Sequence, residues 1–351
     1  MLTKEEQECE ETFVRTHSRD GSGRYVVRLP LADTASDLSG TRVAATRLLA
    51  CMEGRFKRDP RVRDLYRDFM REYESLDHMS PTDSRDATAD GNKCYLPHHG
   101  VLKNVDGKVK LRVVFNGSSS LPSGVALNDK LRVGPNLLPA LPDVLTRWRR
   151  HKHAMATDIE KMYRQILVHP EDRDLQRILW RHDETEPIRD YRLNTVTYGL
   201  ACAPFLAIRS LRQLATDEEA RFPLGSAMLR RDVYVDDILT GAATQEEASK
   251  IQQQLIEICR AGGFPLKKWS ATDPELLKDI PAEDKLRADL RSWEPHESHT
   301  MLGLRWHPSA DQFAYTMRES QPQPATKRAV LSTTAQLFDP LGWLAPVVVR
   351  A

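Results

Sequence analysis

The sequence has neither a long hydrophobic run nor a secretory leader. Its longest apolar run, residues 344–349, is far too short to cross a bilayer, which takes about 20 residues. Residues 1–11 are rich in Glu and contain no apolar stretch, so they do not form a signal peptide. There is also no internal repeat and no low-complexity tract. We therefore expect no membrane association, and the scattered cysteines described next favour a reducing intracellular compartment.

The sequence also has no closely spaced cysteine pair and almost no net charge. Five cysteines are scattered over 351 residues without a Cys-x-x-Cys pair, which excludes the usual disulfide and zinc patterns. Lys and Arg number 51 against 50 Asp and Glu, so the net charge of +1 indicates no partner. Residues 101–150, however, carry nine basic side chains against three acidic ones. This segment favours phosphate contacts, with an ordinary solvated basic face as the alternative.

Two adjacent carboxylates, Asp236 and Asp237, are prominent in the second half of the chain. They lie between the β-forming runs 233–235 and 238–240, so we expect them at or beside a hairpin turn. Two like charges in apolar surroundings repel each other and lose hydration. A divalent cation is the usual compensation, because Mg²⁺ prefers carboxylates together with substrate phosphates. An exposed Asp-Asp turn is the alternative for the pair taken alone.

A third acid, Asp158, follows a run of small and apolar residues at 153–157. Apolar side chains then recur at helical spacing, so Asp158 caps a helical turn or lies in a cleft at a strand end. Residues 191–198 alternate as a strand, Pro204 opens a helix, and residues 264–269 return as a strand. This order predicts an α+β fold in which helices pack on one face of a sheet.

The first part of the chain is informative about packing more than about chemistry. Residues 3–17 and 41–79 have helical patterns, and a new helix begins at Asp59-Pro60. The polar loop at residues 80–92 is the best candidate boundary between domains.

A basic hairpin follows this loop. Residues 93–102 and 108–115 are expected to be strands joined by an Asp-Gly turn. Lys108, Lys110 and Arg112 alternate onto one face of the second strand, which makes a basic ribbon facing solvent. An ordinary amphipathic strand is the alternative.

The order of these motifs resembles that of a reverse transcriptase. The matching pieces are Asp158 with Tyr163 five residues later, Val-Thr-Tyr-Gly-Leu-Ala-Cys-Ala-Pro at 196–204, Tyr-Val-Asp-Asp at 234–237, Gly-Phe-Pro-Leu-Lys-Lys-Trp at 263–269 and Met-Leu-Gly at 301–303. More specifically, residues 23–30, 158–163, 198–204 and 326–342 resemble the polyprotein of Bel/Pao-type LTR retrotransposons. The resemblance covers nearly the whole chain.

The resemblance implies an RNA-directed DNA polymerase that adds deoxynucleotides to a primer 3′-end. Such enzymes hold two divalent ions, Mg²⁺ or Mn²⁺, on three carboxylates, which would be Asp158, Asp236 and Asp237 here. Asp158 and Asp236 match the principal metal ligands, and Asp237 tunes the site. The ions would lower the pKa of the primer 3′-hydroxyl and neutralise charge on the attacked phosphate. Lys268, or its neighbour Lys267, matches the residue that protonates the leaving pyrophosphate.

The resemblance also implies where the nucleotide binds. Lys110 and Arg112 match residues that contact the incoming triphosphate, to which Arg is suited by its fixed fork of donors. Tyr163 matches a steric gate against the ribose 2′-hydroxyl, which predicts deoxynucleotide substrates. A core aromatic residue is the alternative for Tyr163. Tyr198 and Gly199 match the segment beside the nucleotide and the template.

The implied fold is the right hand of a polymerase, with fingers, palm and part of a thumb. Its palm is an antiparallel sheet packed by helices, and Leu302 and Gly303 match the primer grip. The expected segments are a mainly helical N-terminal extension (1–80), fingers with the basic ribbon (81–150), the palm with the carboxylates (151–305) and the start of a thumb or connection (306–351).

The sequence also departs from the family. Asn116 stands where the family usually has Asp, which puts the fidelity of the fingers in doubt. No segment matches an RNase H, integrase or protease, so we expect a fragment of a polyprotein or a truncated copy, with those parts as partners. Template-primer and deoxynucleoside triphosphates are the other expected partners, and a cytoplasmic virus-like particle is the expected location. The alternatives are an inactive remnant that only binds nucleic acid and, less compatible with Tyr163, an RNA-dependent RNA polymerase.

Overall fold

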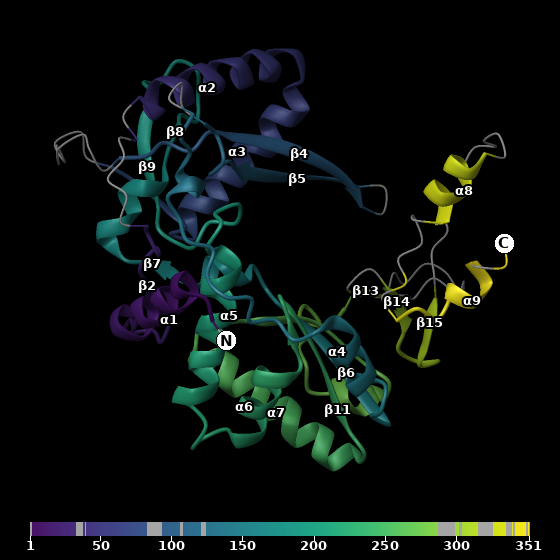
Figure 1. Cartoon of the computed structure of the whole chain (residues 1–351). Helices are drawn as coiled ribbons and strands as arrows, with labels where there is room; N and C mark the ends of the chain where they lie inside the picture. The colour runs from purple at the N-terminus through teal and green to yellow at the C-terminus, as the bar shows by residue number, and fades with distance from the viewer. Residues whose placement is uncertain are drawn as a thin grey trace. The chain divides into compact units, whose positions relative to one another are not determined.

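The chain forms two compact units (Figure 1), of which the first comprises Met1–Leu137 and Lys161–Ser210, and the second Leu138–Glu160 and Leu211–Ala351. The predicted division at residues 80, 150 and 305 stays a prediction. In the described part, no helix is both long and apolar enough to cross a membrane. The structure is a computed structural model that describes residues 2–32, 38, 40–82, 93–105, 108–120, 124–286, 299–301, 304–314, 326–334, 339, 341–348 and 350.

The first unit contains three helices before residue 76, and capping residues define the start of two of them. Thr3 and Glu6 form a capping box at the start of the first helix, and the Asp59 side chain accepts from the Val62 amide at the start of the third. Pro60 occupies the first turn of that helix, as predicted from the sequence. The helices are α1 (Lys4–Thr16), α2 (Thr41–Arg58) and α3 (Pro60–Ser75).

The helices α2 and α3 pack on the predicted hairpin (Figure 1). Its strands pair antiparallel from His98 opposite Phe115 to Val105 opposite Lys108, which confirms the hairpin. Phe56 of α2 and Tyr66 of α3 contact each other and Trp180 in a buried aromatic cluster. His98 of the hairpin contacts Tyr66 and Trp180, so α2 and α3 share a core with the hairpin. The strands are β4 (His98–Val105), β5 (Lys108–Phe115) and β8 (Arg177–Trp180).

Two small three-stranded sheets, with the orders β1-β2-β7 and β3-β9-β8, complete the described strands of this unit. The helix expected after Asp158 is only a short 3₁₀ turn, because Lys161 adopts a left-handed conformation (φ 51°) that an α-helix cannot continue through. The remaining elements are β1 (Ser18–Arg19), β2 (Tyr25–Val27), β3 (Met79–Pro81), β7 (Leu167–Val168), β9 (Arg189–Leu193) and the 3₁₀ turns η2 (Leu127–Asp129), η3 (Met162–Gln165) and η4 (Pro170–Gln176).

The second unit is organised on an antiparallel sheet with the strand order β10-β11-β6-β12. Three helices accompany it, and a fourth, α5, begins in the first unit at the predicted place beside Pro204 and ends in the second. The elements are α4 (Leu141–Trp148), β6 (His153–Ile159), α5 (Ala203–Asp217), α6 (Pro223–Arg231), β10 (Val233–Tyr234), β11 (Asp237–Ala242), α7 (Gln245–Ala261) and β12 (Leu266–Ala271).

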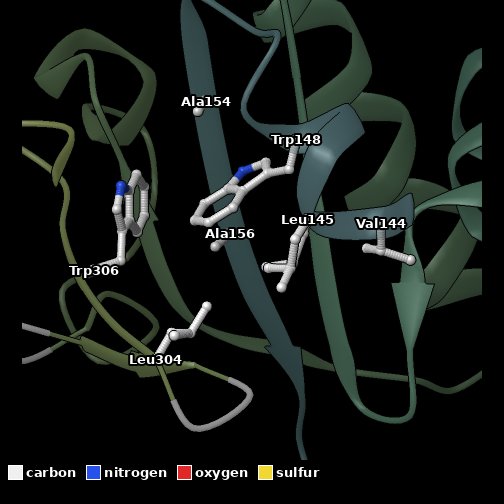
Figure 2. Packing of buried hydrophobic residues seen from close by; sticks show 8 residues of the cluster. Val144, Leu145, Trp148, Ala154, Ala156, Leu304 and Trp306 are labelled. Carbon is white, nitrogen blue, oxygen red and sulfur yellow. The ribbon is translucent and has the colours of Figure 1, made fainter. Parts of the chain in front are cut away.

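Helices pack on both faces of this sheet, so the expectation of one covered face was wrong. On one face, Trp148 of α4 packs against Ala154 and Ala156 of β6 (Figure 2). Thr240 of β11 belongs to the opposite face, because side chains alternate along a strand, and it hydrogen-bonds to Met228 of α6. The sheet is therefore enclosed, and its strand ends remain for function.

The last described elements belong to the second unit. A three-stranded sheet, β13-β14-β15, contributes Leu304 and Trp306 to the core around Trp148 (Figure 2). Its strands are β13 (His299–Met301), β14 (Leu304–His307) and β15 (Gln312–Ala314), and η5 (Pro274–Leu277), α8 (Lys327–Thr334) and α9 (Ala345–Val348) are the other elements.

Candidate active site

Asp158 and Asp237 lie opposite each other on neighbouring strands of the second unit. Asp158 is the penultimate residue of β6, Asp237 is the first of β11, and the two are partners in the antiparallel register. The amide of Ile159 donates to the backbone oxygen of Asp236 at 2.8 Å. Asp158 is therefore a strand residue rather than a helix cap, and it meets the distant pair Asp236 and Asp237 at one end of the sheet.

The hairpin that carries the acid pair is strained. Tyr234 of β10 pairs with Asp237 of β11, so Val235 and Asp236 form a two-residue turn. Val235 adopts φ 58°. A β-branched residue rarely tolerates this region, and such a conformation costs on the order of 1–3 kcal/mol. Strained backbone conformations persist only where the surrounding structure fixes them, and they are common next to functional groups.

The acids affect one another electrostatically. Burial, followed by the negative charges of Asp236 and Asp158, raises the pKa of Asp237 to about 7, while the positive charge of Lys268 opposes the rise. Asp237 therefore exchanges its proton near neutral pH. A carboxyl held this way, beside two others, marks a functional-site candidate.

Lys268 supplies the cation of this cluster. Its ammonium donates to Oδ2 of Asp158 at 2.8 Å. Lys268 lies in an irregularity of β12, between the paired residues Lys267 and Ser270, and has φ 56°. Lys267 instead forms an ion pair with Asp284. Of the two candidate lysines, Lys268 is thus the one that contacts the acids.

The chemistry of the donor set suits a divalent cation. Carboxylate oxygens are the ligands that Mg²⁺ and Mn²⁺ prefer. Burial and, after it, the repulsion from Asp236 and Asp158 raise the pKa of Asp237, and a bound cation offsets both by favouring the ionised carboxylate. In the described ranges, no group of three His, Cys, Asp or Glu side chains already has metal-binding geometry. Asp158 instead holds the Lys268 ammonium, and the metal assignment remains a proposal.

Two of the predicted nucleotide-binding residues, Arg112 and Tyr198, meet within the first unit. The Arg112 guanidinium of β5 lies over the Tyr198 ring, 5.1 Å from its centroid. The Tyr198 hydroxyl donates to the backbone oxygen of Val113. The Arg164 guanidinium also lies over the Tyr198 ring, 5.6 Å from its centroid, and it lies 4.7 Å from the centroid of the Tyr73 ring. Arg164 was not singled out from the sequence, because no local pattern indicates a cation held among aromatic rings that are distant in the chain.

Gly199 owes its identity to close packing. It has φ 101°, and a Cβ there would lie 2.7 Å from the backbone oxygen of Phe115. Asn128 secures the same turn, since its Nδ2 donates to the Gly199 oxygen at 2.9 Å. Asn116 has a local role too, accepting from the Ser118 amide at 3.0 Å just after β5.

The other predicted residues are only partly placed. Tyr163 lies in η3 of the first unit, and Lys110 is exposed on β5, opposite Lys103 of β4. Leu302 and Gly303 lie outside the described residues.

Comparison with known proteins bears on the segment that contains these acids. Residues 113–272 match the family model described as reverse transcriptase (RNA-dependent DNA polymerase). No curated protein matches the chain.

Among solved structures, the foamy viral protease-reverse transcriptase dRH in complex with ds DNA is similar at 17% identity with a TM-score of 0.48, over 75% of this chain and 37% of that one. Prototype Foamy Virus protease-reverse transcriptase is similar as a selenomethionine-labelled CSH mutant (16% identity, TM-score 0.44, 59% and 24% covered) and in native form (16%, 0.42, 57% and 23%). This chain therefore spans well under half the length of each. The segment that matches the reverse transcriptase family model, residues 113–272, holds Asp158, Asp236, Asp237 and Lys268.

Proposed function

We propose that this protein is an RNA-directed DNA polymerase that adds deoxynucleotides to a primer 3′-end by a two-metal mechanism. The observation that carries the proposal is the meeting of Asp158, Asp236 and Asp237 at one end of the β6–β11 pair, inside the reverse transcriptase domain. In the terms of the right hand, the sheet β10-β11-β6-β12 is the palm, the β4–β5 hairpin belongs to the fingers, and the last elements begin a thumb.

The chain's own residues supply a binding site and a proton donor. Asp158, Asp236 and Asp237 would hold two Mg²⁺ or Mn²⁺ ions, which would activate the primer hydroxyl and neutralise phosphate charge. Because burial and like charge raise the pKa of Asp237, its carboxyl is fully ionised for this role only above about pH 7. Lys268 carries a proton into the site and can give it to the leaving pyrophosphate as general acid.

The residues of the first unit would recognise the nucleotide. The Arg112 guanidinium, oriented on the Tyr198 ring, presents paired donors to phosphate oxygens. Lys110 adds a second exposed positive charge on the same face of β5. Tyr163 would exclude the ribose 2′-hydroxyl, which selects deoxynucleotides, and Leu302 with Gly303 would hold the primer end.

The proposed biological setting follows from the sequence motifs. We place the chain in the polyprotein of a Bel/Pao-type LTR retrotransposon, acting on template-primer in a cytoplasmic virus-like particle. Protease, RNase H and integrase would be its partners in that polyprotein.

Primer extension on a primed RNA template tests the activity. With Mg²⁺ or Mn²⁺ and deoxynucleotides we expect DNA synthesis, and none from Asp236→Asn, which keeps the shape of the side chain but removes a metal-binding charge. Template-primer binding, followed by fluorescence anisotropy, should be the same in both proteins. Full extension by the variant would refute the metal assignment. Binding without extension in the unmodified protein would favour an inactive remnant, and incorporation of ribonucleotides would contradict the role of Tyr163.

A further inference from the structure

Two neighbouring lysines of β12 lie near Asp158, and the strand register favours the one that does not contact it. Lys267 is the direct partner of Asp158 in the antiparallel pairing of β12 with β6. Side chains directly opposite each other have Cβ atoms about 4.5–5.5 Å apart, so a lysine at this position is well placed to pair with the carboxylate. The Lys268 ammonium nevertheless donates to Oδ2 of Asp158, at 2.8 Å. A feature other than the register therefore decides between the two lysines.

A bulge in β12 accounts for the reach of Lys268. Between the paired positions 267 and 270, β12 has two residues where β6 has one. Bulges of this kind re-aim a side chain. Lys268 is the first of the two residues and has φ 56°, a left-handed conformation that is unfavourable for a residue other than glycine. The bulge therefore needs support from outside the β6–β12 pair.

Residues 281–286, here called the strap, supply that support. The Trp269 amide donates to the backbone oxygen of Asp284 at 2.8 Å, and the Leu286 amide donates to the backbone oxygen of Trp269 at 3.0 Å. Both backbone groups of Trp269 are thus bonded to the strap, and its side chain is buried. The strap therefore fixes the second residue of the bulge and, with it, the direction of Lys268.

The side chain of Asp284 holds the other lysine. Its Oδ1 accepts from the Lys267 ammonium in a partly buried ion pair. The backbone oxygen of Lys267 accepts from the Thr157 hydroxyl of β6 at 2.9 Å. Lys267 therefore stays in the ladder with β6 while its ammonium is bound at the strap.

We propose that Asp284 is a positioning residue that selects Lys268, rather than Lys267, as the lysine of the active site. Asp284 binds the ammonium that the register places opposite Asp158, while the strap backbone holds the bulge that brings Lys268 to the same carboxylate. Asp284 acts through Lys267 and Trp269, so it is not itself a catalytic residue. A purely structural role, in which the ion pair only stabilises the strap, is the alternative.

This inference rests on the proposed function and deepens it. The strap lies outside residues 113–272, the segment that matches the reverse transcriptase family model. It assigns to the polymerase site a residue that the motifs of the sequence do not indicate, because the choice between the lysines depends on a segment that pairs with the outer edge of β12.

A double-mutant cycle separates the two roles of Asp284. Asp284→Asn keeps the backbone oxygen that accepts from Trp269 and removes the charge that holds Lys267. The freed Lys267 then competes for Asp158, so we expect the single-turnover rate of nucleotide addition to fall at least about threefold, and at most by the roughly hundredfold that loss of a general acid costs. In the Lys267→Met background the competitor is absent, and Asp284→Asn should have no effect on the rate.

Two further measurements show that the effect is specific. The KM for deoxynucleotides and the affinity for template-primer, followed by anisotropy, should stay the same, because the selected lysine acts on the leaving group. Glu246→Gln is the matched control, since it removes an acid that binds Lys250 at 2.6 Å on the exposed side of α7 in the same unit. It should alter neither the rate nor the two binding constants. Urea unfolding verifies that each variant is folded.

Lysine acetylation gives a readout that does not depend on activity. Treatment with acetic anhydride, followed by mass spectrometry, should modify Lys267 and Lys268 about twofold faster or more in Asp284→Asn. Lys267 loses its ion pair in that variant, and Lys268 then shares Asp158 with it. The faster modification of Lys268 should disappear in the Lys267→Met background.

The outcomes distinguish this inference from the polymerase proposal. An equal loss of rate from Asp284→Asn with and without Lys267→Met would overturn the inference in favour of a structural role and leave the proposed function intact. Unchanged acetylation of Lys268 in Asp284→Asn would overturn the inference as well. No extension by the unmodified protein would contradict the proposed function, whereas the acetylation of Lys268 would still decide whether Asp284 selects between the lysines.

Discussion

Replacing Asp237 by Asn should stabilise the metal-free protein while impairing the reaction. The folded protein holds the Asp237 proton up to about pH 7, whereas the usual pKa of an aspartate is 3.8, so the folded state binds this proton more tightly than the unfolded chain. The stabilisation that this proton contributes is therefore fully present below pH 3.8 and is lost as pH rises toward 7, by about 1.4 kcal/mol per pH unit. Above pH 7 the loss is complete, at about 4 kcal/mol. Asn resembles the neutral acid and escapes this loss.

The measurement is urea or thermal unfolding with a chelator present, at pH 5 and pH 8. We expect Asp237→Asn to exceed the unmodified protein by about 4 kcal/mol at pH 8 and by less than about 2 kcal/mol at pH 5. The first value corresponds to a midpoint shift on the order of 10 °C. Added Mg²⁺ should reduce the difference, because it binds the ionised cluster of the unmodified protein and stabilises it.

Asp190→Asn is the matched control with the opposite sign. Burial acts to raise the pKa of Asp190, but hydrogen bonds from Arg42 and Tyr95 outweigh it and lower the pKa. Its removal should therefore destabilise the protein above about pH 4 and matter less as pH falls. If Asp237→Asn were no more stable than the unmodified protein at pH 8, burial and the neighbouring acids would not disfavour the ionised Asp237 carboxylate as the structure requires.

Three further predictions concern the sheet and its surroundings. Gly241→Ala should lower the free energy of unfolding by about 1–3 kcal/mol in a urea titration, because the new Cβ would clash with the backbone oxygen of His153. Gly54→Ala in α2 is the control, since its Cβ would meet nothing within 4 Å and the change should be stabilising. Trp148→Ala should cost about 3–5 kcal/mol in the same assay, since the ring is 1% exposed in the core of Figure 2; an effect under about 1 kcal/mol would contradict that packing. Lys268→Met should change the free energy of unfolding by less than about 1 kcal/mol, because the side chain is 53% exposed. It should nevertheless shift the pH profile of primer extension upward, since the positive charge of Lys268 opposes the raised pKa of Asp237. An unshifted profile would contradict an electrostatic effect of Lys268 on the acids.

Local sequence patterns predicted the elements of the site better than their contacts. The runs around Asp236 and Asp237 indicated a hairpin, and the structure has β10, a two-residue turn and β11. A strand end for Asp158 was one of two expectations, and it was confirmed over the helix cap. The helix after it was wrong, because apolar spacing does not reveal a single left-handed residue such as Lys161.

What sequence could not supply is the register between strands far apart in the chain. Asp158 and Asp237 are 79 residues apart, and nothing in either segment alone says that they are partners rather than neighbours by one residue. A slip of one position would turn one of the two side chains to the other face of the sheet. The register is instead fixed by the core, where Ala156 opposite Leu239 must meet Trp148. The packing of this apolar face around Trp148 thus determines which carboxylates meet at the end of the same strands, two or three residues from Ala156 and Leu239. For this reason a core variant such as Trp148→Ala should disturb the acid cluster, although Trp148 is not part of it.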